Sequence, residues 1–572
     1  MFNPETDRVE FFARLMPREG YETDFAIGTT YSLDLETALC VPLSMEMRAD
    51  SDSKNQKSDI CKIAALEKTA DKIALFCNNG QISADKIPSG RLHILLEKMI
   101  FPVTIPNEGK HASFHSKFWL IRFKNKENEN DVFFRLIVLS RNLTADKSWD
   151  VIYSEDSVAG KEANDKNENL QNYVRYLAGR LHDNKTKKGK MEGIANELAT
   201  HGFSGSTEFL AFYPNHRPLP DFFNAENKRR KEGNILVISP FVSKKTIQNI
   251  IDHFDMVVLI TNPESLGKIS KTWLESKTFK VYVLNEFFVH AKMYATDKDI
   301  YLGSFNASEN AIRNNVETLV RFRRYGVRAF ETVSGELLDE KKKMFLPVSA
   351  DDSRLNAGEE GAEDTDNLAQ EILREFLSLS PEGRFNKTSR ELTVTTKRTF
   401  APSEPFEIEP LQARTSSCRW EKGKKVVFKA INGNETAFSA FYKVTIGDNF
   451  SKVVIIPTLG LPDGREAAVL DAVINDTNVK DYILYWLDSG YLPSFEEREQ
   501  ETDGKKGSTF RGGEAFSGLY EKMLEAVCRK DAADVFEKLE KSLKPLMTDE
   551  RLLKLIEKFK TTAKEAKKQC WT

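Results

Sequence analysis

The stretch FHSKFWLIRF, residues 114–123, predicts a β-strand that carries a histidine and a lysine where apolar side chains are expected. Successive side chains of a strand point to opposite faces, so His115 and Lys117 share one face and the flanking phenylalanines share the other. An apolar strand that places an imidazole beside an ammonium group therefore needs a chemical explanation.

A second copy of this pattern lies in VHAKMYATDKDIYLGSFNASENAIRNNVETLVRF, residues 289–322, where His290 and Lys292 again share one face. Two H-x-K matches alone mean little, because eight histidines and abundant lysine give about one match by chance. In each copy, however, a further strand ends in S-x-N and an acid follows. The residues at these positions are Asn142 and Asn306 for the asparagine, and Asp150 and Glu317 for the acid.

An internal repeat with a polar face on each copy predicts two α/β halves that meet across a pseudo-twofold axis. If the two H-x-K strands face one another, the side chains of His115 and His290 should lie within roughly 4 to 7 Å, a span that one phosphate bridges. One chain would then form a complete site, and the oligomeric state is left open.

Strand-like runs such as RLHILLEKMI (91–100), an aromatic-poor acidic stretch and helical spacing near the C-terminus divide the chain into five predicted segments. They are a first half at 1–205 with H-x-K at 115–117, a second half at 206–348 with H-x-K at 290–292, an acidic linker at 349–367, a β-rich accessory domain at 368–495, and a C-terminal helical region at 510–572.

Composition narrows the class of protein. The chain of 572 residues is 40% hydrophobic and 30% charged, with a net charge of -3, so a nucleic-acid surface must be a local basic face. No long apolar run, secretory leader or lipid-anchor motif predicts a membrane partner. Six scattered cysteines without a C-x-x-C pair favour a reducing cytoplasm. We expect no metal and no cofactor.

The segment HAKMYATD fits the H-x-K-x-x-x-x-D signature in full, and GSFN followed by NNVE fits the segment that usually comes after it. On these residues the chain resembles the phospholipase D superfamily over about residues 100–325. The first copy departs from the signature, because Arg122 stands where the second copy has Asp297. The tyrosyl-DNA phosphodiesterase branch also lacks that aspartate, and SRNLTADKSWD is similar to bacterial nuclease-like members.

These residue types suit phosphodiester cleavage without a metal. Two histidines with an ordinary pKa of about 6.5 supply a nucleophile and a proton donor near neutrality, through a phosphohistidine intermediate. Lys117 and Lys292, with the two asparagines, would stabilise the phosphoryl oxygens, and the two acids would fix the histidine tautomers. The residues are symmetric in this respect; the resemblance to the tyrosyl-DNA phosphodiesterase branch implies that His115 attacks and His290 is the general acid and base.

The predicted function is therefore a metal-independent phosphodiesterase or nuclease acting on nucleic acid, with DNA as the expected substrate. Two alternatives stay open: a phospholipase D-type lipid phosphodiesterase, and a catalytically silent scaffold that binds nucleic acid. The resemblance also implies a role in bacterial (antiviral) defence against foreign DNA. A helicase or ATPase partner would be a separate chain, because no G-x-x-x-x-G-K-[ST] motif is present.

Overall fold

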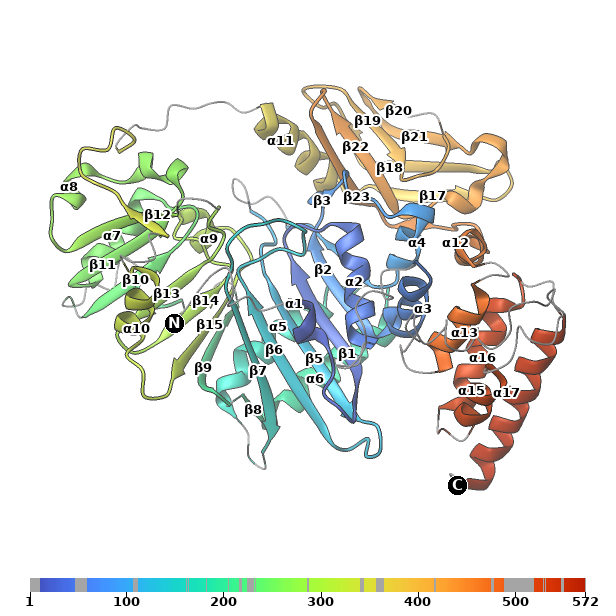
Figure 1. Cartoon of the computed structure of the whole chain (residues 1–572). Coiled ribbons are helices and arrows are strands. Elements are labelled where there is room, and N and C mark those ends of the chain that lie inside the picture. Colours follow the sequence, from blue (N-terminus) through green and yellow to red (C-terminus); the bar gives the residue numbers. More distant parts are fainter. Residues whose placement is uncertain are drawn as a thin grey trace, which may run out of the picture.

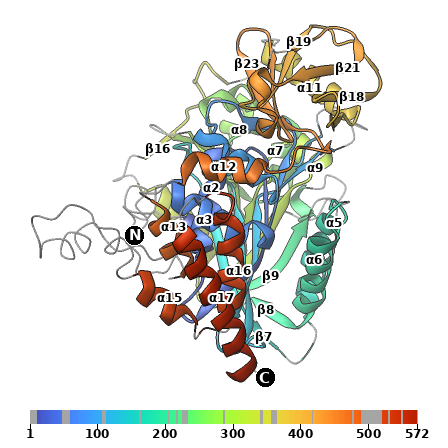
Figure 2. The same cartoon turned by 90° about the vertical axis from the view of Figure 1, so that its right-hand side faces the viewer.

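A computed structural model gives the architecture of the chain (Figures 1 and 2). It describes the whole chain apart from residues 1–10, 47–58, 106–111, 161, 163, 182, 204, 215–218, 224–230, 232, 285–287, 340–343, 356–364, 416–417, 475–477, 488–518, 528, 530, 547–549 and 571–572. Residues 356–364 of the predicted acidic linker and the first residues of the predicted C-terminal region thus lie outside the described residues.

A seven-stranded sheet occupies the N-terminal part, in the order β4-β2-β1-β5-β6-β7-β8. Its first three strands pair in parallel, and from β1 onward each pair is antiparallel. The strands are β1 (Tyr21–Thr30), β2 (Ile73–Asn78), β4 (Ile100–Val103), β5 (Phe118–Asn125), β6 (Val132–Leu139), β7 (Ile152–Ala159) and β8 (His201–Phe203).

An eight-stranded sheet follows, in the order β16-β12-β11-β10-β13-β14-β15-β9. Strands β12, β11 and β10 are parallel, and β10, β13, β14 and β15 pair antiparallel, so the order and sense of β4-β2-β1-β5-β6-β7 are repeated. The strands are β9 (Thr207–Pro214), β10 (Asn234–Ile238), β11 (Met256–Thr261), β12 (Phe279–Leu284), β13 (Met293–Thr296), β14 (Ile300–Gly303), β15 (Thr318–Arg324) and β16 (Phe345–Pro347).

Each sheet separates two apolar cores. One core contains residues of both sheets, including Leu120 of β5 and Leu302 of β14, with Leu170 of α5. The outer faces are covered by helices; in one of them Ser243 caps α7 by accepting from the Thr246 backbone NH. The helices of these two parts of the chain, on all the cores together, are α1 (Phe11–Leu15), α2 (Leu35–Glu46), α3 (Asp59–Thr69), α4 (His93–Leu96), α5 (Glu168–Ala178), α6 (Lys185–Glu197), α7 (Lys244–His253), α8 (Lys271–Leu274), α9 (Glu309–Arg313) and α10 (Ala329–Leu337).

The two H-x-K segments lie just before strands, which corrects the prediction that they lie within them. Strand β5 begins at Phe118 and β13 at Met293. The NH groups of Lys117 and Phe118 donate to the side-chain hydroxyls of Thr318 and Thr29 instead of to backbone carbonyls of a neighbouring strand. The ladder therefore starts only after the lysine, and both motifs occupy the same place in the repeated strand order.

Residues 382–459 form two further sheets, β21-β18-β17-β24 and β20-β19-β22-β23-β3, with α11 (Thr365–Ser378) packed into their apolar core. Strand β3 (Ile82–Ser83) comes from the N-terminal part and pairs with β23, so the two parts share a sheet. The strands are β17 (Glu382–Asn386), β18 (Glu391–Phe400), β19 (Phe406–Pro410), β20 (Cys418–Trp420), β21 (Gly423–Lys429), β22 (Phe441–Ile446), β23 (Phe450–Ile455) and β24 (Thr458–Leu459).

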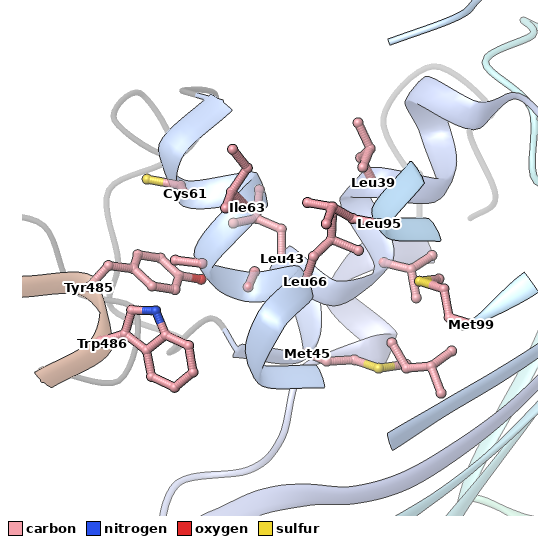
Figure 3. Packing of buried hydrophobic residues seen from close by; sticks show 14 of the residues in the cluster. Leu39, Leu43, Met45, Cys61, Ile63, Leu66, Leu95, Met99, Tyr485 and Trp486 are labelled. Atoms are coloured by element: carbon pink, nitrogen blue, oxygen red, sulfur yellow. The ribbon is translucent and has the colours of Figure 1, made fainter. Parts of the chain in front are cut away.

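The remaining described elements are helices. Two of them, within residues 465–487, lie in the segment 368–495 that was predicted to be β-rich. Tyr485 and Trp486 pack against the helix that contains Cys61 and Ile63 (Figure 3). Among the described helices, none has the length and apolar character needed to cross a bilayer. The helices are α12 (Arg465–Val473), α13 (Val479–Leu487), α15 (Leu519–Val527), α16 (Ala532–Leu543) and α17 (Glu550–Cys570).

A glycine in β1 limits what the first sheet accepts next to the H-x-K segment. A Cβ atom at Gly28 would lie 2.6 Å from the ring of Trp119, which is fully buried. We expect Gly28→Ala to lower the free energy of unfolding by about 1–3 kcal/mol, because the core cannot absorb the extra volume. Gly193→Ala in α6 is the matched control: its Cβ meets no heavy atom within 4 Å, so it should stabilise by about 0.5–1 kcal/mol. Equal effects in chemical denaturation would contradict this account of packing.

Candidate active site

His115 is held by an acid from the other half of the repeat. Its Nδ1 lies 2.8 Å from Oε2 of Glu317, whose side chain is fully buried. The second carboxylate oxygen of Glu317 accepts from Asn315 Nδ2 at 3.0 Å, and Asn315 Oδ1 in turn accepts from the hydroxyl of Ser113 at 2.9 Å. The carboxylate is thus fixed at both oxygens, and Nε2 of His115 is the ring nitrogen left for chemistry.

His290 is held in the corresponding way by an acid from the first half. Its Nδ1 lies 3.1 Å from Oδ1 of Asp150. The carboxylate of Asp150 also accepts from the hydroxyls of Ser140, at 3.2 Å, and Ser148, at 2.9 Å. Both acids singled out in the sequence therefore contact a histidine, and each contacts the histidine of the opposite copy.

Backbone pairing fixes this exchange of acids between the two copies. Phe114 forms an isolated bridge with Val316, and the NH of His115 donates to the Val316 carbonyl at 2.8 Å. On the other side, Trp149 bridges Val289, and the NH of His290 donates to the Trp149 carbonyl at 2.9 Å. Each histidine is thus attached to the residue that precedes its acid, which sets the position of one relative to the other.

The serine of each S-x-N segment clamps the residue that follows the acid. Ser140 Oγ accepts from the Val151 NH at 3.0 Å, and Ser304 Oγ accepts from the Thr318 NH at 2.9 Å. Both serines are fully buried. They are positioning residues in the fold of the site, because each holds in place the backbone directly after Asp150 or Glu317.

Both lysines are fully buried, and each Nζ donates to the backbone carbonyl of the histidine two residues earlier, at 3.0 Å for Lys117 and 2.6 Å for Lys292. Within the described part of the chain, no carboxylate makes a salt bridge with either ammonium group. Burial lowers the pKa of Lys117 well below its usual value and that of Lys292 to about 8. A bound anion would favour the charged form of both.

The electrostatics also bring the two copies together in one site. Burial is the main cause that lowers the pKa of His115 to about 4, and the charges of Lys117 and Lys292 add to that effect. Burial likewise lowers the pKa of His290, with contributions from Lys292 and Lys117. Each histidine therefore feels the lysine of the opposite copy, and both are neutral at pH 7 before substrate binds.

The two asparagines lie with the motif strands and do not cap helices. Helix α9 is capped by Ser308 instead of Asn306, and the residues after Asn142 form no helix before Asp150. The Oδ1 atoms of Asn142 and Asn306 are buried and lack a hydrogen-bond partner among the described residues. A side-chain amide can rotate to exchange its oxygen and nitrogen, so these groups are poised to adjust to a ligand.

The signature aspartate has a structural role in the second copy. Asp297 Oδ2 accepts from the NH of Asn234, and Oδ1 accepts from the Asn234 side chain, so it closes the start of β10. In the first copy Arg122 makes the equivalent connection by donating to Asp24 of β1 at 2.8 Å, and it also donates to Glu197. The arginine of the first copy therefore keeps a link to β1, as the aspartate of the second copy keeps a link to β10.

Tyr31 is a site residue that the sequence analysis missed. Its ring lies 4.8 Å from the imidazole of His115, and the Nζ of Lys117 lies 5.6 Å from the centre of the same ring. Burial raises the pKa of the Tyr31 hydroxyl. In the sequence Tyr31 comes one residue after the end of β1, and only that position at a strand end, where ligands often bind, could have suggested it.

The site offers a nucleophile, a proton donor and fixed cations, which is what transfer of a phosphoryl group requires. Each imidazole presents one nitrogen outward and has its other nitrogen fixed by a carboxylate. Among the described residues, we find no group of three or more His, Cys, Asp or Glu side chains arranged to hold a metal ion. The charges of Lys117 and Lys292 both act on the two histidines.

Comparison with known proteins found similarity at the level of solved structures. No protein-family model matches the chain. No curated protein matches it either. Among solved structures, polyphosphate kinase from Porphyromonas gingivalis is 13% identical with a TM-score of 0.35, over 62% of this chain and 48% of that one. The chain thus spans about half the length of that kinase.

Two further matches are yeast tyrosyl-DNA phosphodiesterase and the phospholipase D family member Nuc from Salmonella typhimurium. The first is 14% identical over 55% of this chain and 87% of that one, with a TM-score of 0.35. The second is 11% identical over 24% of this chain and 98% of that one, with a TM-score of 0.18. Conclusions about chemistry rest on the geometry of the site.

Replacing the acid behind His115 tests the role of the pairing. We expect Glu317→Gln to lower kcat on a phosphodiester by about 10²–10⁴-fold, because a neutral partner no longer stabilises the imidazolium or fixes its tautomer. The KM should change little, since Glu317 lies behind the imidazole. Glu208→Gln, at a partly exposed surface position, is the control. Unchanged kcat in Glu317→Gln, at an unchanged melting temperature, would contradict the role assigned to the pair.

Proposed function

We propose that this chain is a phosphodiesterase that cleaves nucleic acid without a metal, through a phosphohistidine intermediate. One observation carries the proposal: two histidines, each paired with the acid of the opposite copy, share one site with two buried lysines. The same residues, with Asn142 and Asn306, are the catalytic set proposed here. The two copies are proposed to be related by a pseudo-twofold axis through this site.

In the first step, Nε2 of His115 attacks phosphorus. A P–N bond forms and the P–O bond to the leaving group breaks, while His290 as imidazolium transfers its proton to the departing oxygen. The free site holds both histidines neutral, so binding of the anionic substrate must raise the pKa of His290, which then takes up a proton from solvent. The depressed pKa of His115, about 4, keeps it neutral and nucleophilic.

In the second step, the now neutral His290 takes a proton from water as the water oxygen attacks phosphorus. A P–O bond forms, the P–N bond breaks, and His115 leaves with its lone pair restored, so a phosphomonoester is released. Lys117 and Lys292 stabilise the nonbridging oxygens through both steps. The order of the two histidines follows the resemblance to the tyrosyl-DNA phosphodiesterase branch, and the low pKa of His115 supports it.

DNA is the proposed substrate, on the strength of the resemblance of SRNLTADKSWD to bacterial nuclease-like members. From the same resemblance we propose a cytoplasmic role in defence against foreign DNA, with any helicase or ATPase as a separate chain. The segments proposed as an accessory β-rich domain, 368–495, and as a helical region, 510–572, would act on substrate choice.

The experiment that tests the proposal traps the intermediate. Purified protein is incubated with labelled DNA, RNA and phospholipid substrates in excess chelator, and we expect cleavage of nucleic acid to persist. With an activated nitrophenyl diester, His290→Ala should accumulate a phosphoryl adduct, because a good leaving group needs little protonation but hydrolysis still needs a base. His115→Ala should neither turn over nor form an adduct.

Mass spectrometry after an acid-free quench locates the phosphate. His253→Ala, in α7, is the control and should behave as the wild type. An adduct on His290 would reverse the order of the two histidines. Activity lost in chelator and restored by magnesium would contradict the metal-free mechanism, and cleavage of phospholipid alone would replace nucleic acid by lipid as the substrate.

The pH dependence of kcat/KM follows from the two histidine pKa values. His115 must be neutral, and its pKa of about 4 sets the acid limb, so activity rises as pH increases through that value. His290 must be protonated, and its pKa lies below its ordinary 6.5, so activity falls above that lowered value. We expect an optimum on the acid side of neutrality for an ordinary diester, and a flatter alkaline limb for a nitrophenyl diester. A steady rise from pH 5 to pH 9 would contradict these roles.

A further inference from the structure

Two phenylalanine side chains stand exposed beside His290. The side chain of Phe241 is 50% exposed and that of Phe288 is 44% exposed, although the neighbouring residues Val242 and Val289 are buried. Their ring centres are 6.1 Å apart, and the ring of Phe288 lies 6.5 Å from the imidazole of His290. Exposed aromatic rings next to a polar site are unfavourable in water, so their presence there points to a ligand that covers them.

The backbone under both rings is tied to the site. The carbonyl of Phe241 accepts from the hydroxyl of Ser239 at 2.7 Å, and the same hydroxyl accepts from the NH of Ala307 at 2.9 Å, next to Asn306. The carbonyl of Phe288 accepts from the NH of Trp149 at 2.9 Å, next to Asp150. The Phe241–Phe288 pair is therefore held in place by backbone segments next to the second histidine, its acid and its asparagine.

We propose that the Phe241–Phe288 pair stacks the base of the nucleotide that carries the leaving oxygen. This inference rests on the proposed function, in which His290 gives its proton to that oxygen. A base is joined to its phosphate through one sugar, so a base stacked on Phe288 places its own phosphodiester at His290. Stacking requires an unpaired base, and the pair therefore selects single-stranded nucleic acid or a frayed end.

A base fits the pair better than an acyl chain does. Two rings offer flat faces of about the size of one base, whereas a lipid would bury a long apolar chain and needs a continuous apolar surface. The polar surroundings also suit a nucleotide, because His290 and the buried Lys292 bind its phosphate while the rings take its base. The pair would thereby give the site a preference for an unpaired base on the leaving side of the scissile phosphate only.

The test is a cycle between protein and substrate. The substrate is a tetradeoxynucleotide with one natural phosphodiester flanked by methylphosphonate linkages, made with either a base or an abasic tetrahydrofuran on the leaving nucleotide. On the intact substrate, Phe288→Ala should lower kcat/KM by about 5- to 150-fold, the effect of losing one stacked base, and Phe241→Ala should act in the same direction. Removing the base should cost the wild type as much, and Phe288→Ala should then have no further effect.

Controls and contrary outcomes are defined by the same measurements. Phe288→Trp should restore most of the activity on the intact substrate, and Tyr325→Ala, 59% exposed at the far end of β15, should behave as the wild type. Equal loss by Phe288→Ala on both substrates, or none on either, would overturn the stacking role while cleavage by the wild type upholds the proposed function. Failure of the wild type to cleave any oligonucleotide would overturn both, and loss of binding to phosphatidylglycerol vesicles in Phe288→Ala would assign the rings to a lipid surface.

Discussion

The site depends on the exchange of acids between the two copies of the repeat. Neither half alone can satisfy its histidine, because Glu317 lies behind His115 and Asp150 behind His290. A buried carboxylate without a partner is costly, since the desolvation of its charge is no longer offset. The two halves must therefore meet before either carboxylate contacts its histidine, and this ties assembly of the fold to assembly of the site.

Two buried lysines make the free site electrostatically incomplete. Each lysine Nζ donates one hydrogen bond to a backbone carbonyl, and burial lowers the pKa of both lysines. A phosphoryl anion placed between them would restore the favourable state of both charges at once. In the proposed function, binding of the phosphodiester offsets the cost of burying the lysines. Interactions that strengthen as charge moves onto the phosphoryl oxygens would then favour the transition state over the ground state.

Sequence reasoning could find this site because its chemistry is repeated at fixed spacing. Comparison of the two copies is enough to single out the pairs His115–Lys117 and His290–Lys292 and the acids that follow them. Which acid contacts which histidine could not be read, because the pairing joins positions 202 and 140 residues apart and both local and crossed pairings fit the pattern. Residues 91–100 were predicted to be a strand from their apolar character. They include α4 instead, because a short buried helix and a buried strand share the same composition and tertiary packing decides between them.

The accessory sheets are attached to the His115 side of the site by two consecutive asparagines. Asn78 Oδ1 accepts from the NH of Phe114 at 2.8 Å, beside His115, and the side chain of Asn79 exchanges two hydrogen bonds with the backbone of Ile455 in β23. The charge of Arg374 in α11 reaches Tyr31, where it opposes the rise in the tyrosine pKa that burial causes. The accessory segment thus borders the His115 side of the site, and the exposed phenylalanines border the His290 side. Under the proposed function the two histidine–lysine pairs are nearly symmetric, so this difference between their surroundings would give a substrate strand its direction through the site.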